Sequence, residues 1–281
     1  MKKFKDKVRY GIDKYIPFGV KKIIFNILYF PKNILRGLQF VNFEYDLKKT
    51  SKLAQLSWAT SDISSKFDDN SIFLKNIISY LEKSYSLKLE SDENIKLKSS
   101  RQYEFEYLNM NNFPGEHYRL LAAICEVENL NQITEIGTGS GIACKVILNN
   151  SNAKINTVDI IPWDESNSHL TISEFQDQRI TQIIADLSSK KTFEEYSYLF
   201  TEPDLIFLDA GKDGIFEDAF LKNLAEVELS NKNRLLLIDD IKYFTMYKVW
   251  KKIQSPKLDL SSFGHWSGTG IVDISRGLNY L

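Results

Sequence analysis

The chain has 281 residues, 43% of them hydrophobic and 26% charged, and its formal net charge is −1. This composition is typical of a soluble globular protein with one substantial core, and no stretch approaches the roughly 20 apolar residues of a membrane-spanning helix. No signal peptide is recognisable. Cys125 and Cys144 lie in apolar stretches, which argues against a disulfide framework or a cysteine metal site. We therefore expect a cytoplasmic protein without a nucleic-acid partner.

Residues 1–45 form a basic amphipathic segment. Residues 1–36 hold ten lysines and arginines but only two aspartates, which gives a local charge of +8. Because apolar and cationic residues are interleaved there, one interpretation is a helix that lies in the interface of an anionic membrane. The other is that the apolar residues pack against the rest of the chain, or against a second subunit in a homodimer. Both interpretations stay open.

Residues 46–128 are predicted to form a helical region that covers a sheet and helps to close a pocket. Apolar residues recur at intervals of three and four in SIFLKNIISYLEKSY and EHYRLLAAICEVE, as in a helix with one buried face. The polar stretch between them, LESDENIKLKSSRQYEFEYLNMNNFPG, is predicted to be a loop that forms part of a substrate lid.

Residues 129–281 consist of short β-rich runs that alternate with helical or polar segments. The predicted strands lie in QITEIG, KINTVDII, RITQIIAD, DLIFLDA, RLLLIDDI and GTGIVDIS. Such alternation predicts an α/β domain built on a parallel sheet. Because the ligands of open α/β sheets bind outside the carboxyl ends of the strands, we expect the functional site there.

A glycine-rich turn with Gly137, Gly139 and Gly141 follows the first of these strands. Each glycine allows a sharp backbone turn or the close approach of a ligand. The spacing is GxGxG rather than the GxGxxG of dinucleotide-binding turns, and Glu135 stands two residues ahead. A carboxylate in that place would repel a pyrophosphate but would hold a cation such as an amino group.

Two acids follow the next two predicted strands. Asp159 lies eighteen residues beyond Gly141 and ends the second strand, where a carboxylate can accept hydrogen bonds from both ribose hydroxyls. Asp186 ends the third strand, where it could hydrogen-bond an adenine amino group. These positions predict an adenosine ligand. The alternative for each acid is an ordinary surface carboxylate after a strand.

The ordered set EIGTGSG, VDII, IIAD, DLIFLDA and LLLIDDI resembles the class I S-adenosylmethionine-dependent methyltransferases over about residues 113–281. The resemblance implies a Rossmann-like α/β fold, with a mostly parallel sheet, helices on both faces and an antiparallel last strand, here with an N-terminal helical extension. It also implies that Glu135 lies close to the amino-acid end of the cofactor, Asp159 at the ribose and Asp186 near the adenine. The implied cofactor-binding residues are Glu135, Gly137, Thr138, Gly139, Gly141, Asp159 and Asp186.

DLIFLDAGKD and LLLIDDI are similar, more narrowly, to the metal-dependent O-methyltransferases of the catechol and caffeoyl-CoA type. In those enzymes an Asp after strand four and an Asp-Asn pair after strand five bind a divalent cation. A Lys three residues after the first Asp acts near the reacting hydroxyl. The matching residues are Asp209, Asp239, Asp240 and Lys212. Asp240 replaces the Asn of the catechol pattern, and a double Asp is more similar to the sugar-modifying branch of these enzymes.

The three aspartates also predict a metal on physical grounds. Asp209 ends one strand and Asp239 ends the next, with Asp240 adjoining, so three carboxylates should converge at one end of the sheet. Unpaired like charges at such a place would be expelled or protonated, and Mg²⁺ or Mn²⁺ with oxygen ligands resolves the repulsion. The alternative is that Lys212 and other lysines neutralise the cluster.

The resemblance implies an enzyme that transfers a methyl group to a hydroxyl with the help of a divalent cation. Asp209 and Lys212 would be catalytic, and Lys212 would accept the proton or steady the oxyanion. The expected acceptor is a sugar hydroxyl in a glycan or lipid-linked precursor, followed by a small catechol-like phenol. Two other classes stay open: an NAD-dependent oxidoreductase, against which the GxGxG spacing counts, and a noncatalytic partner protein that binds S-adenosylmethionine.

The histidines give weaker signals. His265 and Trp266 form either a packed aromatic turn or a pocket wall with a proton-accepting histidine. His117 and His169 show no ligand spacing, and no role is predicted for them.

Overall fold

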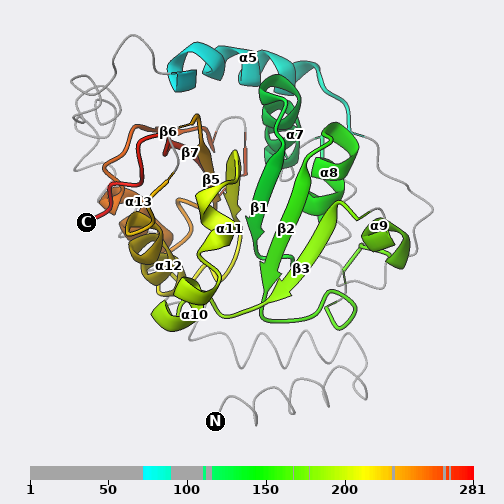
Figure 1. Cartoon of the computed structure of the whole chain (residues 1–281). Helices are drawn as coiled ribbons and strands as arrows, with labels where there is room; N and C mark the ends of the chain where they lie inside the picture. Colours follow the sequence, from blue (N-terminus) through cyan, green and yellow to red (C-terminus); the bar gives the residue numbers. More distant parts are fainter. Residues whose placement is uncertain are drawn as a thin grey trace, which may run out of the picture. The chain divides into compact units, whose positions relative to one another are not determined.

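The computed structural model describes residues 72–89, 110–111, 116–166, 168–176, 178–229, 232–261, 264–265 and 267–281 (Figure 1). The predicted basic segment 1–45 and most of the predicted lid loop lie outside the described residues, as does Trp266. Among the described helices, none combines the length and the apolar character needed to cross a membrane.

Seven strands of the described chain form one sheet in the order β3-β2-β1-β4-β5-β7-β6. The strands are β1 (Gln132–Ile136), β2 (Lys154–Asp159), β3 (Ile180–Ile184), β4 (Leu205–Leu208), β5 (Leu235–Asp239), β6 (Lys257–Asp259) and β7 (Thr269–Asp273). β7 runs antiparallel to both of its neighbours, and all other neighbouring pairs are parallel. The predicted fold class, including the antiparallel last strand, is confirmed.

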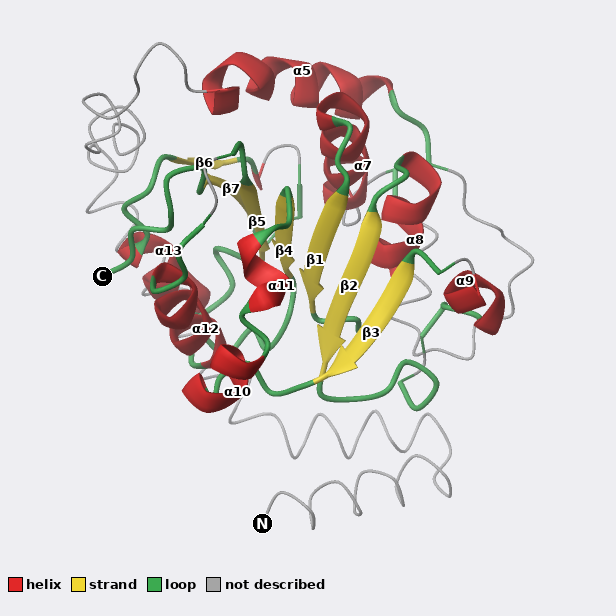
Figure 2. Ribbon diagram, in the orientation of Figure 1, coloured by secondary structure: helices red, strands yellow, loops and turns green. Residues whose placement is uncertain are grey.

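Helices lie on both faces of this sheet (Figure 2). They are α5 (Ile72–Ser86), α7 (Glu116–Glu128), α8 (Ile142–Asn150), α9 (Ile172–Gln176), α10 (Lys190–Glu195), α11 (Tyr198–Thr201), α12 (Phe216–Ala225) and α13 (Met246–Lys252). Helices α5, α7 and α8 share one buried apolar cluster with Ile133 of β1. Helices α10 to α13 share a second cluster with Ile136 of the same strand. Because successive strand residues point to opposite faces, β1 supplies both clusters.

The register of the parallel strands aligns the residues that follow them. Ile136 pairs with Val158 on one side and with Leu208 on the other, and Leu208 pairs with Ile238. The next residue of each strand therefore lies at one level along the edge of the sheet. Those residues are Gly137, Asp159, Asp209 and Asp239.

The direction of the connections changes between β1 and β4. The chain leaves β1 for β2 and then β3 on one side, and returns to β4 on the other side. In open α/β sheets this switch point opens a crevice beyond the carboxyl ends of the strands, and ligands bind there. The aligned residues thus flank the expected ligand position.

Candidate functional site at the switch point

The glycine turn after β1 is closed on one side and open on the other. Gly137 has a φ of +100°, and a Cβ built on it would lie 2.1 Å from the backbone oxygen of Asp209, so only glycine allows this approach of β1 to β4. Gly139 has a φ of +46°, and apart from its chain neighbours no atom of the described chain lies within 4 Å of a Cβ built there. Gly141 directly precedes α8, and its amide donates to the Thr138 oxygen at 2.7 Å. A ligand can therefore come close to the backbone at Gly139.

Asp159 ties this turn to the end of β2. Its Oδ2 accepts a hydrogen bond from the Gly139 amide at 3.0 Å. Its Oδ1 accepts from the amides of Ile160 at 2.7 Å and Ile161 at 3.1 Å. The carboxylate is half-buried, so it shapes the turn and still faces the solvent beside it.

A chain of polar side chains lies beneath the turn. Gln182 donates to Thr138 Oγ1 at 3.0 Å, and the hydroxyls of Thr138 and Thr157 are 2.8 Å apart. Thr157 and Cys144 both donate to Oε2 of Glu135, the cysteine at 2.8 Å. This network joins β1, β2, β3 and α8 behind the residues that face the crevice.

Glu135 is a buried carboxyl in this network. It is 1% exposed, and its Oε1 has no hydrogen-bond partner among the described residues. Burial raises the pKa of Glu135 to about 8, although the hydrogen bonds from Cys144 and Thr157 oppose the rise. The carboxyl is therefore protonated at neutral pH. To hold an ammonium group, as the sequence predicted, it would have to lose this proton when the ligand binds.

We expect Glu135→Gln to remove a pH dependence of stability. The folded chain binds more protons than the unfolded chain between pH 4.5, the ordinary pKa of this carboxyl, and about 8. Raising the pH through this window should lower the free energy of unfolding of the parent protein, by about 1 kcal/mol between pH 6 and pH 7. Urea unfolding at several pH values measures this change. The exposed Glu194→Gln is the control for a Glu→Gln exchange that leaves the buried carboxyl in place. An unchanged slope in Glu135→Gln would contradict the assignment.

Asp186 lies two residues beyond β3 and is exposed. Its Oδ1 accepts hydrogen bonds from the amide of Ser188 at 3.0 Å and from the Ser188 hydroxyl at 2.6 Å. These bonds form a local turn that fixes the carboxylate at the same edge of the sheet as Asp159. The predicted contact with an adenine stays a prediction.

The three aspartates predicted as metal ligands lie together after β4 and β5. Each of Asp209, Asp239 and Asp240 offers a ligand atom within 4.8 Å of the others. Lys212 Nζ lies among them, 3.0 Å from Asp209 Oδ1, 3.6 Å from Asp239 Oδ2 and 2.5 Å from Asp240 Oδ2. The four side chains form an acid cluster with its own counter-ion. This arrangement matches the alternative interpretation from the sequence, in which Lys212 neutralises the aspartates.

The loop that carries Lys212 is held by Glu217 of α12. The backbone amide of Lys212 donates to Glu217 Oε1, and the amide of Gly214 donates to Oε2 at 2.9 Å. Glu217 is fully buried, and Lys212 has a φ of +61°, in the left-handed region. This anchor was not predicted, although an acid five residues after Lys212, in the first turn of α12, was a signal for it.

Charge and burial oppose each other in the acid cluster. Burial raises the pKa of Asp209, and Lys212 opposes the rise. For Asp239 burial alone would raise the pKa, but His117, His265 and Lys212 hold it well below its usual range. For Lys212 burial alone would lower the pKa, but the three carboxylates raise it well above its usual value. Lys212 is therefore a protonated ammonium in this structure.

His265 belongs to the same cluster. Its Nδ1 lies 3.0 Å from Asp240 Oδ1, 3.6 Å from Asp239 Oδ2 and 2.6 Å from the hydroxyl of Ser267. Burial alone would lower the pKa of His265, but hydrogen bonds and charge from the two aspartates raise it to about 10. This geometry favours a histidine at the site wall over a packed aromatic turn. Ser267, which also donates to Asp240, was not predicted.

The sheet and the turn together identify the fold. The antiparallel β7, the glycine turn after β1 and the acids after β2, β4 and β5 stand in the order that the resemblance requires. The chain has the class I methyltransferase fold. The acid cluster and the glycine turn lie on the two sides of the switch point of this methyltransferase fold.

No family model and no curated protein sequence matches the chain. A solved SAH-bound methyltransferase from Podospora anserina is 18% identical, with 76% of this chain and 98% of that chain covered at a TM-score of 0.44. An O-methyltransferase from Bacillus cereus in complex with SAH is 15% identical over 64% and 93% of the two chains, with a TM-score of 0.40. A short-chain dehydrogenase/reductase from Veillonella parvula in complex with NADP is 18% identical over 34% and 42%, with a TM-score of 0.28. The fold assignment itself rests on the sheet.

Proposed function

We propose that this chain is an S-adenosylmethionine-dependent O-methyltransferase. The observation that carries the proposal is the alignment of Gly137, Asp159, Asp209 and Asp239 at one level beside the switch point. A cofactor over the glycine turn would then lie next to the acid cluster. Two reactants held at neighbouring strand ends are positioned for transfer between them.

The open space at Gly139 supports a cofactor that lies against the backbone. Asp159 would accept hydrogen bonds from the ribose hydroxyls, and Asp186 would lie near the adenine. Glu135 and Thr138 would act below the turn, at the amino-acid end of the cofactor. The GxGxG spacing disfavours the pyrophosphate of NAD.

The donor set of the acid cluster fits a divalent cation. Asp209, Asp239 and Asp240 offer oxygen ligands within 4.8 Å of one another, which suits Mg²⁺ or Mn²⁺. The chemistry that such a cation supplies when bound is a lower pKa for the acceptor hydroxyl. Lys212 now occupies the centre of the three carboxylates, and with 35% of its side chain exposed it has room to withdraw.

Lys212 is proposed to act on the acceptor oxygen. As a protonated ammonium it would donate a hydrogen bond to the oxygen and steady its negative charge, which is one of the two roles expected from the sequence. The acceptor hydroxyl gives up its proton when the methyl group is transferred. Lys212 would accept that proton only in its neutral form, after losing its own ammonium proton to solvent once the carboxylates had been neutralised. Without the cation, Asp209 and Asp240 hold the ammonium at 3.0 Å and 2.5 Å.

A sugar hydroxyl of a glycan or lipid-linked precursor is the proposed acceptor, because Asp240 replaces the Asn of catechol-type enzymes. A small phenol is the second candidate. Residues 1–36, which the structure does not describe, would bring the protein to anionic membranes through their charge of +8. A protein that binds the cofactor without turnover on any acceptor is the noncatalytic alternative, and an acceptor screen distinguishes it.

We expect Asp159→Ala to weaken binding of S-adenosylhomocysteine by about 1.5–3 kcal/mol, because the variant loses charge-assisted hydrogen bonds to the ribose. Isothermal titration calorimetry measures the change. Asp159→Asn keeps an acceptor for the Gly139 amide and should fall between the parent and Asp159→Ala.

Asp164→Ala, in the exposed loop that follows, is the matched control and should bind like the parent. Unchanged affinity in Asp159→Ala would remove this residue from the cofactor site.

A further inference from the structure

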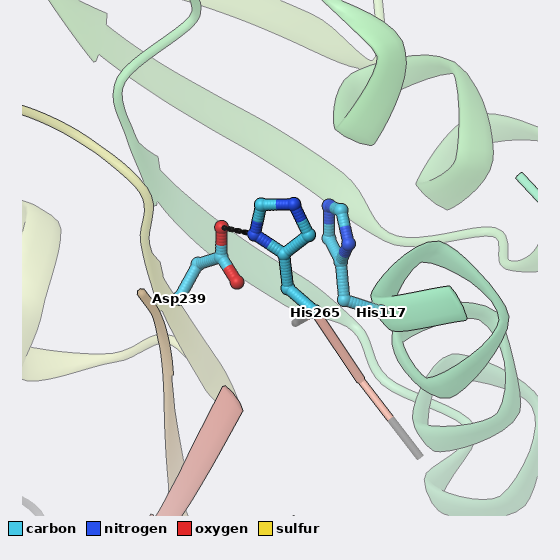
Figure 3. Close-up of side chains that lie close together, drawn as sticks. All are labelled: His117, Asp239 and His265. Atoms are coloured by element: carbon cyan, nitrogen blue, oxygen red, sulfur yellow. Dashed lines mark ion pairs between the residues drawn. The ribbon is translucent and has the colours of Figure 1, made fainter. Parts of the chain in front are cut away.

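Two histidines meet Asp239 on the side of the acid cluster that faces α7. His117 comes from α7, Asp239 from the end of β5, and His265 from the loop before β7 (Figure 3). One ligand atom of each residue lies within 4.8 Å of the others. Segments far apart in the sequence thus bring two imidazoles and one carboxylate close together.

His117 is buried against Tyr118 and His265, and its hydrogen-bonding capacity is not used up among the described residues. It is 3% exposed, and its Nδ1 has no hydrogen-bond partner in the part of the chain that the structure describes. Its ring centroid lies 4.9 Å from that of His265, with the rings tilted by 53°. A buried polar atom without a partner costs free energy, so its retention calls for a ligand.

His265 is oriented by groups around it. Asp240 and Ser267 contact its Nδ1, at 3.0 Å and 2.6 Å. The same nitrogen lies 3.6 Å from Asp239 Oδ2 (Figure 3), so Asp240 and Ser267 fix this edge of the ring beside Asp239. Thr269 donates to Asp239 Oδ1 at 3.3 Å and so orients the third residue.

We propose that His117, Asp239 and His265 form a binding site for a divalent transition-metal ion such as Zn²⁺, Co²⁺ or Fe²⁺. Two imidazole nitrogens and one carboxylate oxygen suit these ions, whereas Mg²⁺ prefers oxygen ligands alone.

This site differs from the oxygen-ligand site considered above. The two share Asp239, but the histidine site does not use Asp209 or Asp240 as ligands. The inference does not depend on methyl transfer, since it concerns metal binding by the chain without cofactor. Failure of either proposal therefore leaves the other standing.

The test is titration of the full chain with Co²⁺, followed by visible absorption, and with Zn²⁺, followed by calorimetry. One saturable site per chain is expected. Bound Co²⁺ should absorb visible light strongly, as Co²⁺ does at a low coordination number. Loss of a group that only orients a ligand already costs about 10–100-fold in metal affinity, so His117→Ala and His265→Ala should each lose at least about 100-fold. Circular dichroism confirms that the variants are folded.

Two controls separate this site from other binding. His169→Ala removes the remaining one of the three histidines and should bind Co²⁺ and Zn²⁺ like the parent. Asp209→Asn removes a carboxylate of the oxygen-ligand site alone and should lower both affinities much less than His117→Ala does. Equal losses in His117→Ala and His169→Ala, or no saturable binding by the parent, would overturn the proposal and leave the contact of His117 with His265 as packing only.

Discussion

Gly137→Ala is expected to destabilise the protein by at least about 3 kcal/mol, or to prevent folding. A non-glycine residue at a φ of +100° costs about 1–3 kcal/mol by itself. The added Cβ would also lie 2.1 Å from the backbone oxygen of Asp209, so β1 and β4 would have to separate. Chemical denaturation followed by circular dichroism measures the loss.

Gly139→Ala is the matched control in the same turn. Its φ of +46° lies in the left-handed region, where alanine costs about 1–2 kcal/mol, and no clash accompanies the added Cβ. The variant should fold, but its methyl group should fill the space at the backbone and weaken binding of S-adenosylhomocysteine. Similar stability losses in both variants would contradict the structure of the turn, and full cofactor affinity in Gly139→Ala would contradict the proposed place of the cofactor.

Lys212→Met is expected to slow methyl transfer by about 10²–10⁴-fold, which is the usual contribution of a positioned group that exchanges or shares a proton with the substrate. Binding of S-adenosylhomocysteine should change little, because Lys212 lies at the acid cluster and not at the glycine turn. Single-turnover rates with an acceptor found by screening measure the chemical step.

Lys242→Met is the control for the loss of a lysine near β5. Lys242 is 34% exposed, close to the 35% of Lys212, but its ion pair is with Asp259 at 2.8 Å, outside the acid cluster. Its turnover should stay near that of the parent. If both lysine variants had equal rates, Lys212 would only neutralise the aspartates.

Most of the fold was predictable because the central strands are buried on both faces. Leu205–Leu208 is apolar throughout and flanked by polar residues, which is typical of a parallel strand inside an α/β sheet. Helices form over SIFLKNIISYLEKSY and EHYRLLAAICEVE as predicted. In the second helix burial extends beyond one face, because residues 120–125 are all buried. β6 (Lys257–Asp259) was not predicted, because three residues at the edge of the sheet with one apolar side chain give no periodic signal.

The ends of the strands were predictable because the buried apolar runs mark where each strand stops. The chemistry of the side chains at these ends was predictable only in part. Once the register is fixed, Asp209 and Asp239 must lie at one level. Sequence alone did not reveal that Glu135 is buried with a raised pKa, since a single acid before a glycine turn carries no information on its depth. His117 was missed because its partners, Asp239 and His265, are more than a hundred residues away and no local spacing joins them.

The central claim is that the glycine turn binds S-adenosylmethionine, and calorimetric titration of the parent protein with S-adenosylhomocysteine, in chelator and then with Mg²⁺, tests it most directly. We predict saturable binding of one S-adenosylhomocysteine per chain. This binding should persist in chelator, because Gly139 and Asp159 need no cation. NAD should not bind under the same conditions. Binding of NAD without binding of S-adenosylhomocysteine would contradict the account and identify a dinucleotide enzyme instead.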